Sequence, residues 1–206
     1  MIVAGLTGGI ATGKSTVSAF LEQAGAVIVD ADKIARHLVR KGQPAWQKIV
    51  DAFGSSILLL DGELDRSRLG EIIFNDPDQK RILNRIVHPE VGSETAVQLA
   101  EIEKNQPDSL VILDVPLLIE SGMNAGLSEI IVVVIPEPLQ IERLMHRDNL
   151  SQEQALARIR SQMPIDEKKK HATRLIDNSG SRENTRRQTM DIYHQLAGRI
   201  IRQEEL

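Results

Sequence analysis

The chain has no cysteine among its 206 residues, only one tryptophan and one tyrosine, and no long apolar run. Without cysteine there is no disulfide framework and no metal site built from thiolates. The scarcity of aromatic rings argues against a surface on which nucleic-acid bases stack. The longest apolar run, at residues 130–135, is far shorter than the ~20 residues that a membrane-spanning helix needs, so we expect no membrane segment.

Charge is also balanced. With 25 Lys and Arg against 29 Asp and Glu the net charge is −4, which argues against a broad basic surface for duplex nucleic acid. The five histidines are scattered, and no two of them have the i, i+4 spacing of a helical zinc site. The N-terminal "MIVAGLTGG" lacks the basic leader of a signal peptide, so a cytoplasmic location is the default expectation.

Short apolar segments alternate with longer segments of helical periodicity. The segments that we expect to form strands are "MIVAGL", "AVIVD", "LVILDV", "EIIVVVI" and "TRLIDN". All but the last are nearly continuous in apolar residues, as parallel strands buried on both faces are. The pattern predicts an α/β fold with a parallel sheet flanked by helices. Residues 36–109 are mostly helical in pattern and exceed what one crossover needs, so they indicate an inserted helical subdomain. A second helical block runs from residue 137 to about residue 173.

The most specific chemical signal is "GLTGGIATGKST". Gly8, Gly13, Lys14 and Ser15 match G-x-x-x-x-G-K-[ST], directly after an expected strand and before the amphipathic "STVSAFLEQAG". In a P-loop of this kind, glycines let backbone N–H groups wrap around phosphate oxygens at the positive end of a helix dipole. We therefore expect Lys14 to reach the β- and γ-phosphates of a nucleotide, and the Ser15 hydroxyl to bind Mg²⁺.

Carboxylates end two of the expected strands. Asp114 ends "LVILD", where it either holds the magnesium ion or its water shell or is only a solvated strand end, and the sequence favours neither. Asp30 and Asp32 end "AVIVD" and begin the next helical segment. The carboxyl ends of parallel strands open onto the ligand site, so one of this pair can accept the proton of an attacking hydroxyl. The alternative is that both only cap the helix.

These motifs, taken together, resemble the dephospho-coenzyme A kinases, a family of P-loop small-molecule kinases. The segments that carry the resemblance are "LTGGIATGKST", "VDADKIARHLV", "RIVHPEV", "LDVPLLIES", "ERLMHRDNLS", "ARIRSQMP" and "RLIDNSG". It implies one P-loop kinase domain over residues 1–206. Its core would be about 1–58, 107–136 and 173–206, with a helical acceptor-binding insertion at about 59–106 and a helical lid at about 137–172. Many members carry glycine or serine in place of Ala11 or Thr12, which are variable positions of the P-loop pattern.

The resemblance also implies roles for single residues. For catalysis it implies Asp32 as general base, together with Lys14 and Arg143. For ATP it implies Gly9, Ile10, Ala11, Thr12, Gly13, Lys14, Ser15, Thr16, Arg147 and Asn178. For the acceptor it implies Thr7, Asp32, His88, Pro116, Leu117 and Glu120.

Several of these residues have plainer interpretations. Arg143 and Arg147 are four residues apart, so a solvated charged helix face explains their spacing equally well. His88-Pro89 looks at first like the start of a helix, because proline is favoured in a first turn. The lysine run at residues 168–170 is interpreted as surface, or as a lid contact with phosphate.

The resemblance implies transfer of the γ-phosphoryl group of ATP, with Mg²⁺, to the ribose 3′-hydroxyl of dephospho-coenzyme A, the last step of coenzyme A biosynthesis. The alternatives are a P-loop kinase for another small acceptor, such as a nucleoside monophosphate or shikimate, and a non-catalytic nucleotide-dependent switch. We expect only small-molecule partners, with no nucleic acid or membrane. The sequence leaves the oligomeric state open, with a monomer sufficient.

Overall fold

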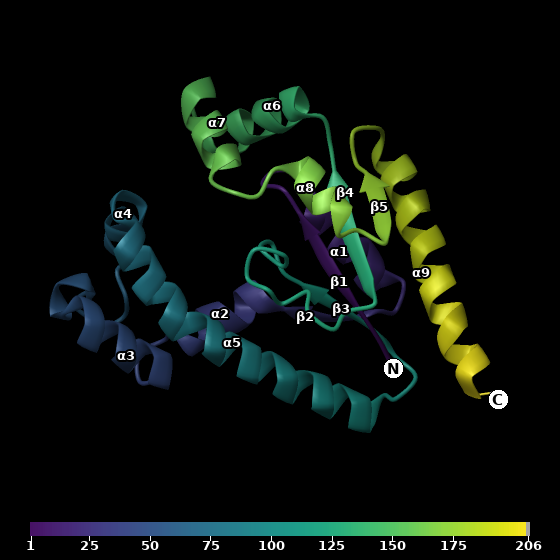
Figure 1. Cartoon of the computed structure of the whole chain (residues 1–206), viewed down its shortest axis with the longest axis horizontal. Helices are drawn as coiled ribbons and strands as arrows, with labels where there is room; N and C mark the ends of the chain where they lie inside the picture. Colours follow the sequence, from purple (N-terminus) through teal and green to yellow (C-terminus); the bar gives the residue numbers. More distant parts are fainter. Residues whose placement is uncertain (205–206) are drawn as a thin grey trace. The chain divides into compact units, whose positions relative to one another are not determined.

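A computed structural model describes residues 1–204 of the chain, the side chains only as far as residue 200. It divides into two compact units (Figure 1). The core unit comprises residues 1–30 and those from 100 onward, and the helical unit comprises residues 31–99.

A parallel sheet forms the centre of the core unit, with the strand order β2-β3-β1-β4-β5. Its strands are β1 (Ile2–Gly8), β2 (Val27–Asp30), β3 (Leu110–Asp114), β4 (Glu129–Val134) and β5 (Arg174–Asp177). Every strand pair is parallel, so the carboxyl ends of all five lie at one edge. The predicted α/β class is confirmed, and each of the five segments expected to form strands does so, with β1 continuing past "MIVAGL" to Gly8.

Helices cover this sheet because its strands are apolar on both faces. Those of the core unit are α1 (Lys14–Gln23), α6 (Glu137–Asp148), α7 (Gln152–Arg160), α8 (Ile165–Lys170) and α9 (Arg182–Glu204). Val17 and Leu21 of α1 and Leu196 of α9 are buried in the same cluster as strand residues such as Leu6 and Ile131. This packing holds α1, and with it the loop that precedes α1, at a fixed place on the sheet.

Helices alone build the helical unit. They are α2 (Ala31–Leu38), α3 (Pro44–Phe53), the 3₁₀ turn η1 (Ser55–Ile57), α4 (Arg66–Asn75) and α5 (Pro77–Asn105), the last of which continues past residue 99. The unit begins at Ala31, whereas the helical pattern of the sequence indicated an inserted subdomain from residue 36 and the family resemblance implied an acceptor-binding insertion from about residue 59. The reason is packing, since Trp46 and Ile49 of α3 share an apolar cluster with Ile57 and Leu69.

His88 and Pro89 do not start a helix, because both lie inside α5. The helix begins instead at Pro77, where the side chain of Asp76 accepts hydrogen bonds from the backbone N–H groups of Asp78 and Gln79. Proline at the first helical position loses no helical hydrogen bond, whereas Pro89 leaves one turn of α5 without its usual donor. The first interpretation of this pair was wrong.

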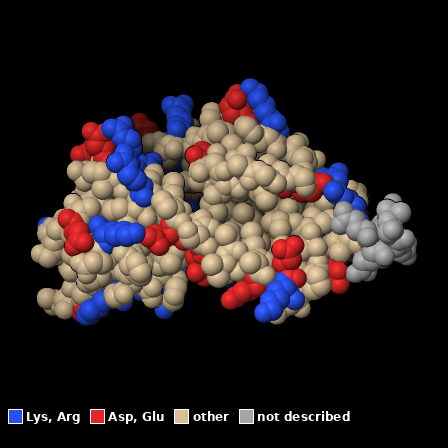
Figure 2. All heavy atoms as spheres, turned by 60° about the horizontal axis from the view of Figure 1, so that its bottom comes forward, with Lys and Arg blue, Asp and Glu red and all other residues tan. Residues whose placement is uncertain are grey.

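Charges of both signs are interspersed over the face shown in Figure 2, with Lys and Arg close to Asp and Glu. This distribution agrees with the small net charge of the sequence. Among the described residues, no helix combines the length and apolar character needed to cross a membrane.

Candidate active site

The P-loop lies between β1 and α1, in the strand–loop–helix context that its motif predicts. Gly13 has a φ of 87°, and a Cβ there would stand 2.0 Å from the side-chain nitrogen of Asn178. A Cβ at Gly8 would stand 2.7 Å from the Thr12 hydroxyl oxygen and 2.9 Å from the carbonyl oxygen of Val133. Both positions therefore require glycine, because a side chain would collide with these neighbouring atoms. Gly13 also requires it because its backbone is left-handed.

Side chains from three other parts of the core unit hold the P-loop backbone. Gln140 of α6 donates to the carbonyl of Ile10 (2.7 Å), and the N–H of Ile10 donates to Gln162 Oε1 (2.9 Å). Asn178, directly after β5, donates to the carbonyl of Thr12 (2.8 Å). These bonds fix the loop in shape before any phosphate arrives, which reduces the reorganisation that binding requires.

Lys14, the first residue of α1, forms an ion pair with the carboxylate of Asp114 at the end of β3. The Asp114 side chain is only 7% exposed, so it is buried and paired rather than a solvated strand end. Asp30 is its register partner at the end of β2. Two carboxylates and one ammonium group are thus set at the edge of the sheet where the P-loop begins.

The oxygen atoms at the carboxyl ends of β2 and β3 and at the start of α1 are suitable ligands for a hard divalent cation. They are the hydroxyl of Ser15 in the first turn of α1 and the carboxylates at the ends of β2 and β3. The described residues contain no group of three or more His, Cys, Asp and Glu able to hold a metal ion. This donor set fits Mg²⁺, which takes one or two carboxylates and completes its shell with water and substrate phosphates.

The two predicted lid arginines differ in their surroundings. Arg143 Nη2 donates to the backbone carbonyl of Asn178 (3.0 Å), close to the P-loop contact of that residue. Arg147 is exposed and bonds the carboxylate of Asp148 through Nε (2.8 Å) and Nη2 (3.1 Å). The hydrogen bond from Arg147 lowers the pKa of Asp148, and Arg158 adds a second ion pair at 2.7 Å. A charged helix face describes Arg147 well, whereas Arg143 points to the P-loop side.

The segment after β3 contains three of the residues predicted for the acceptor: Pro116, Leu117 and Glu120. The buried Thr7 hydroxyl donates to the carbonyl of Pro116 (2.9 Å), so this segment is tied to the strand that leads into the P-loop. Leu117 is 42% exposed. The carboxylate of Glu120 pairs with Lys168 at 2.8 Å. Lys168 is fully buried, so the interpretation of the lysine run as surface was wrong at its first residue.

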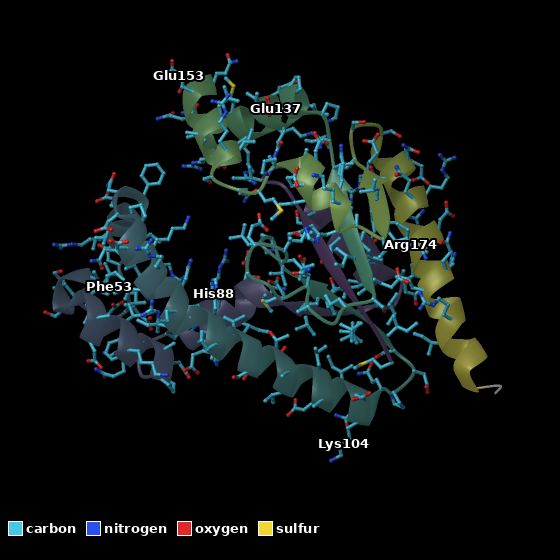
Figure 3. All side chains as sticks on the ribbon, in the orientation of Figure 1. Phe53, His88, Lys104, Glu137, Glu153 and Arg174 are labelled. Carbon is cyan, nitrogen blue, oxygen red and sulfur yellow. The ribbon has the colours of Figure 1, made fainter. Side chains whose placement is uncertain are left out.

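A cavity of about 370 Å³ lies within the helical unit. Asp32, Arg36 and Arg66 supply its charged groups. The rest of its lining is almost entirely apolar: Ala35, Val39, Ile49, Leu64, Leu69, Gly70, Ile73, Leu83 and Val87. Arg66 Nη2 also donates to the backbone carbonyl of Arg36 (3.5 Å), which places the two arginines together. His88 does not line the cavity and is exposed on α5 (Figure 3).

A family model described as dephospho-CoA kinase matches residues 1–184, which include the helical unit and nearly all of the site. The chain belongs to the dephospho-CoA kinase family. The resemblance stated from the motifs is thereby confirmed.

Curated members of the dephospho-CoA kinase family are similar over almost the whole chain. The dephospho-CoA kinase of Carboxydothermus hydrogenoformans is 49% identical over 190 residues, which cover 92% of each chain. That of Oryza sativa subsp. japonica is 42% identical over 206 residues, all of this chain and 89% of its own. Both the P-loop and the helical unit therefore have counterparts in these proteins.

Solved structures agree with the assignment to the dephospho-CoA kinase family. The dephospho-CoA kinase of Campylobacter jejuni has a TM-score of 0.73 and 32% identity, covering 95% of this chain and 97% of its own. A Thermus thermophilus crystal structure reaches a TM-score of 0.78 at 35% identity, with the same coverage. A shikimate kinase from Acinetobacter baumannii, 18% identical with a TM-score of 0.51, shares the fold.

Sequence reasoning within the dephospho-CoA kinase pattern missed several residues of the site. Gln140 and Gln162 form hydrogen bonds with the backbone of Ile10 in the P-loop, which lies more than 100 positions earlier in the sequence. No local motif marks either glutamine. Lys168 was placed on the surface because it stands in a run of three lysines. Arg36 had a usable signal, since it follows Asp32 by one helical turn in "DADKIAR". Arg66 had none beyond its position after the helix cap Asp65.

Proposed function

We propose that the chain catalyses the ATP-dependent phosphorylation of the ribose 3′-hydroxyl of dephospho-coenzyme A, giving coenzyme A and ADP, the last step of coenzyme A biosynthesis. The observation that carries this proposal is the family match over residues 1–184, which takes in both the P-loop and the helical unit. We also propose that the enzyme acts in the cytoplasm.

The core unit is proposed to bind ATP. The backbone of residues 9–16 would surround the phosphates, and Lys14 would exchange part of its contact with Asp114 for the β- and γ-phosphates. Ser15 and Asp114 would hold Mg²⁺, directly or through water, and the ion when bound neutralises charge on the phosphate oxygens. Arg143 would face the transferred phosphoryl group, with Arg147 and Asn178 on the nucleotide side.

The helical unit is proposed to bind dephospho-coenzyme A. This acceptor carries a diphosphate and a long pantetheine arm in which two amide groups join alkyl segments, and the cavity offers two guanidinium groups beside an apolar lining. Arginine suits the diphosphate because its planar fork donates two hydrogen bonds at once. Asp32 would accept the proton of the 3′-hydroxyl, as the carboxylate of a kinase catalytic base does. Thr7, His88, Pro116, Leu117 and Glu120 are proposed as further acceptor contacts.

Residues 137–172 are proposed to act as a lid that excludes water, because hydrolysis of ATP would otherwise compete with transfer. Hydrogen exchange with and without an ATP analogue tests this role. Protection of α6 and α7 should rise with nucleotide, and unchanged protection would argue against closure.

The deciding experiment is an acceptor panel monitored by ADP release. Dephospho-coenzyme A should support release far better than AMP, shikimate or uridine, and the product should carry its new phosphate on the 3′-oxygen by mass and NMR analysis. Faster release with AMP or shikimate would replace the proposed acceptor. Nucleotide binding with no release for any acceptor would favour a nucleotide-dependent switch.

A further inference from the structure

Lys168 is the one member of the run at residues 168–170 whose side chain has no exposed surface. Its neighbours Lys169 and Lys170 are 40% and 68% exposed and pair with Asp166 and Glu167 three residues earlier in α8. Burying an ammonium group is costly unless each of its protons finds an acceptor. The contacts of Lys168 therefore require an explanation that those of its neighbours do not.

Three oxygen atoms lie within 3.1 Å of the nitrogen of this ammonium group. Lys168 Nζ lies 3.1 Å from the carbonyl oxygen of Pro116, 3.1 Å from Glu120 Oε2 and 2.8 Å from Glu120 Oε1. Hydrogen bonds to the Pro116 carbonyl and to Glu120 Oε2, together with the ion-pair contact to Glu120 Oε1, offset the cost of burying the charge. All three oxygen atoms belong to residues 116–120, the segment that follows β3.

The same oxygen atoms bind other parts of the core unit. The carbonyl of Pro116 also accepts from the hydroxyl of Thr7 (2.9 Å), the residue before the first P-loop glycine. Glu120 Oε1 also accepts from the backbone N–H of Met163 (3.1 Å). Gln162, the residue before Met163, accepts the N–H of Ile10. Residues 162–168 are thus tied both to the P-loop and to residues 116–120, with Lys168 making three of the contacts.

Stability alone is a weak reason for this arrangement. Replacing a buried ion pair with apolar side chains of similar size is often neutral or stabilising, so a methionine could fill the same space. What an apolar side chain cannot do is donate hydrogen bonds to the Pro116 carbonyl and the Glu120 carboxylate and so fix both groups in place. That geometric function matters here because Asp114, the partner of Lys14, lies only two residues before Pro116.

We propose that Lys168 is a positioning residue of the phosphoryl-transfer site: it holds residues 116–120 against the strand that leads into the P-loop, so that the acceptor meets the phosphoryl group correctly. The inference rests on the proposed function, in which this segment contacts the acceptor. Lys168 itself touches neither substrate and acts through Pro116 and Glu120.

Substrate-specific kinetics of Lys168→Met test the proposal. A small displacement of reacting groups can cost up to about 10²-fold in rate, so kcat/KM for dephospho-coenzyme A should fall roughly 10- to 100-fold. The KM for ATP and the affinity for ADP, measured by calorimetry, should change by less than about twofold, because the P-loop keeps its contacts with Gln140 and Asn178. Lys104→Met, an exposed lysine at the end of α5 and outside the proposed lid, is the control and should match the unsubstituted enzyme.

Restoring the amine chemically distinguishes the loss of the lysine's hydrogen bonds from the loss of its packing volume. The chain has no cysteine, so Lys168→Cys introduces a unique thiol. Alkylation of the unfolded variant with 2-bromoethylamine, followed by refolding, rebuilds a side chain of lysine length that ends in an ammonium group. Alkylation with 1-bromopropane gives the same length without charge. Turnover of dephospho-coenzyme A should return with the first reagent and not with the second.

The single variant Glu120→Gln covers the case in which Lys168→Met does not fold. Glu120→Gln keeps the lysine and should lower kcat/KM for dephospho-coenzyme A with little effect on ATP. If both single variants fold, their effects should be non-additive, because they disrupt one set of contacts. Wild-type kinetics in Glu120→Gln, equal losses for both substrates, or recovery with the propyl group would overturn the proposal.

Failure of the proposed function would look different. The unsubstituted protein would then not phosphorylate dephospho-coenzyme A, and the same variants would be assayed with whichever acceptor the panel selects. A selective rise in the KM for that acceptor in Lys168→Met would retain the positioning role without the acceptor assignment. Unchanged kinetics in Lys168→Met would argue against both the positioning role and the acceptor assignment.

Discussion

The core unit and the helical unit solve two binding problems by different means. In the core unit the P-loop backbone is fixed by hydrogen bonds from Gln140, Gln162 and Asn178, and Lys14 is already paired with Asp114. In the helical unit the cavity is lined mainly by apolar side chains, with Asp32, Arg36 and Arg66 as its charged groups. Phosphates need oriented donors, whereas a long organic acceptor needs apolar surface with a few polar groups.

This difference predicts which substrate's binding and turnover a given substitution affects. A change in the core unit should alter the use of ATP, and with it every acceptor. A change in the cavity of the helical unit should alter the use of dephospho-coenzyme A and leave ATP affinity as it was. The predictions below test that division, beginning with the largest expected effect.

Asp32→Asn should lower kcat by roughly 10²–10⁴-fold, because it removes the proposed base while keeping the size of the side chain. Since Asp32 belongs to the helical unit, ATP affinity by calorimetry should stay close to that of the unsubstituted enzyme. Asp30→Asn is the comparison variant and should cost less turnover. A loss confined to melting temperature would instead favour the alternative in which Asp32 only caps α2.

Lys14→Ala should lower kcat by roughly 10²–10³-fold with any acceptor, because the transition-state charge loses a positioned cation. The substitution should also lower the free energy of unfolding, because the buried Asp114 loses its partner; removing an exposed loop lysine would not have this effect. Breaking a buried ion pair costs about 3 kcal/mol of unfolding free energy, which urea denaturation would measure.

The double variant Lys14→Ala with Asp114→Asn separates these two effects. Neutralising Asp114 should restore most of the stability and none of the turnover. If the double variant were no more stable than Lys14→Ala, the ion pair would not explain the loss of stability.

The parts of the molecule that sequence predicted are those with local rules. Strand segments such as residues 110–114 are apolar throughout, and the P-loop motif fixes the positions of Gly8, Gly13 and Lys14 within eight residues. Period and spacing were therefore enough for the sheet and for the nucleotide side. The roles of Asp32 and the lid arginines came from the family resemblance and remain predictions.

The parts that sequence did not predict depend on contacts between distant segments. Lys168 is indistinguishable from Lys169 and Lys170 until α8 is packed beside residues 116–120. The helical pattern and the family resemblance gave different starts for the insertion, because nothing local says that Trp46 and Ile49 pack with Leu69. Burial of a charge and membership of a core are properties of the packed chain, and a single sequence does not display them.

Arg36→Gln and Arg66→Gln should each raise the KM for dephospho-coenzyme A roughly 10- to 100-fold, since a hydrogen bond to a charged group contributes about 1.5–3 kcal/mol. The KM for ATP should not change. Arg81→Gln is a matched control, because Arg81 also lies in the helical unit but is 72% exposed and pairs with Asp78. An equal rise in the KM for ATP would break the division between the units.

Ala11→Gly should have the smallest effect and tests whether hydrogen bonds hold the P-loop in shape. Ala11 has a φ of 59°, a left-handed conformation that costs a residue with a Cβ about 1–2 kcal/mol and glycine almost nothing. If the contacts of Gln140, Gln162 and Asn178 fix the loop, glycine should relieve this strain without loosening it. Unfolding free energy should then rise by about 1 kcal/mol, with ATP affinity unchanged.

Asn149→Gly is the matched control. Asn149, at the end of α6, has a φ of 52°, but asparagine tolerates this region, so the gain in stability should be smaller. Weaker ATP binding in Ala11→Gly would mean that the alanine itself, and not the surrounding hydrogen bonds, keeps the loop ordered.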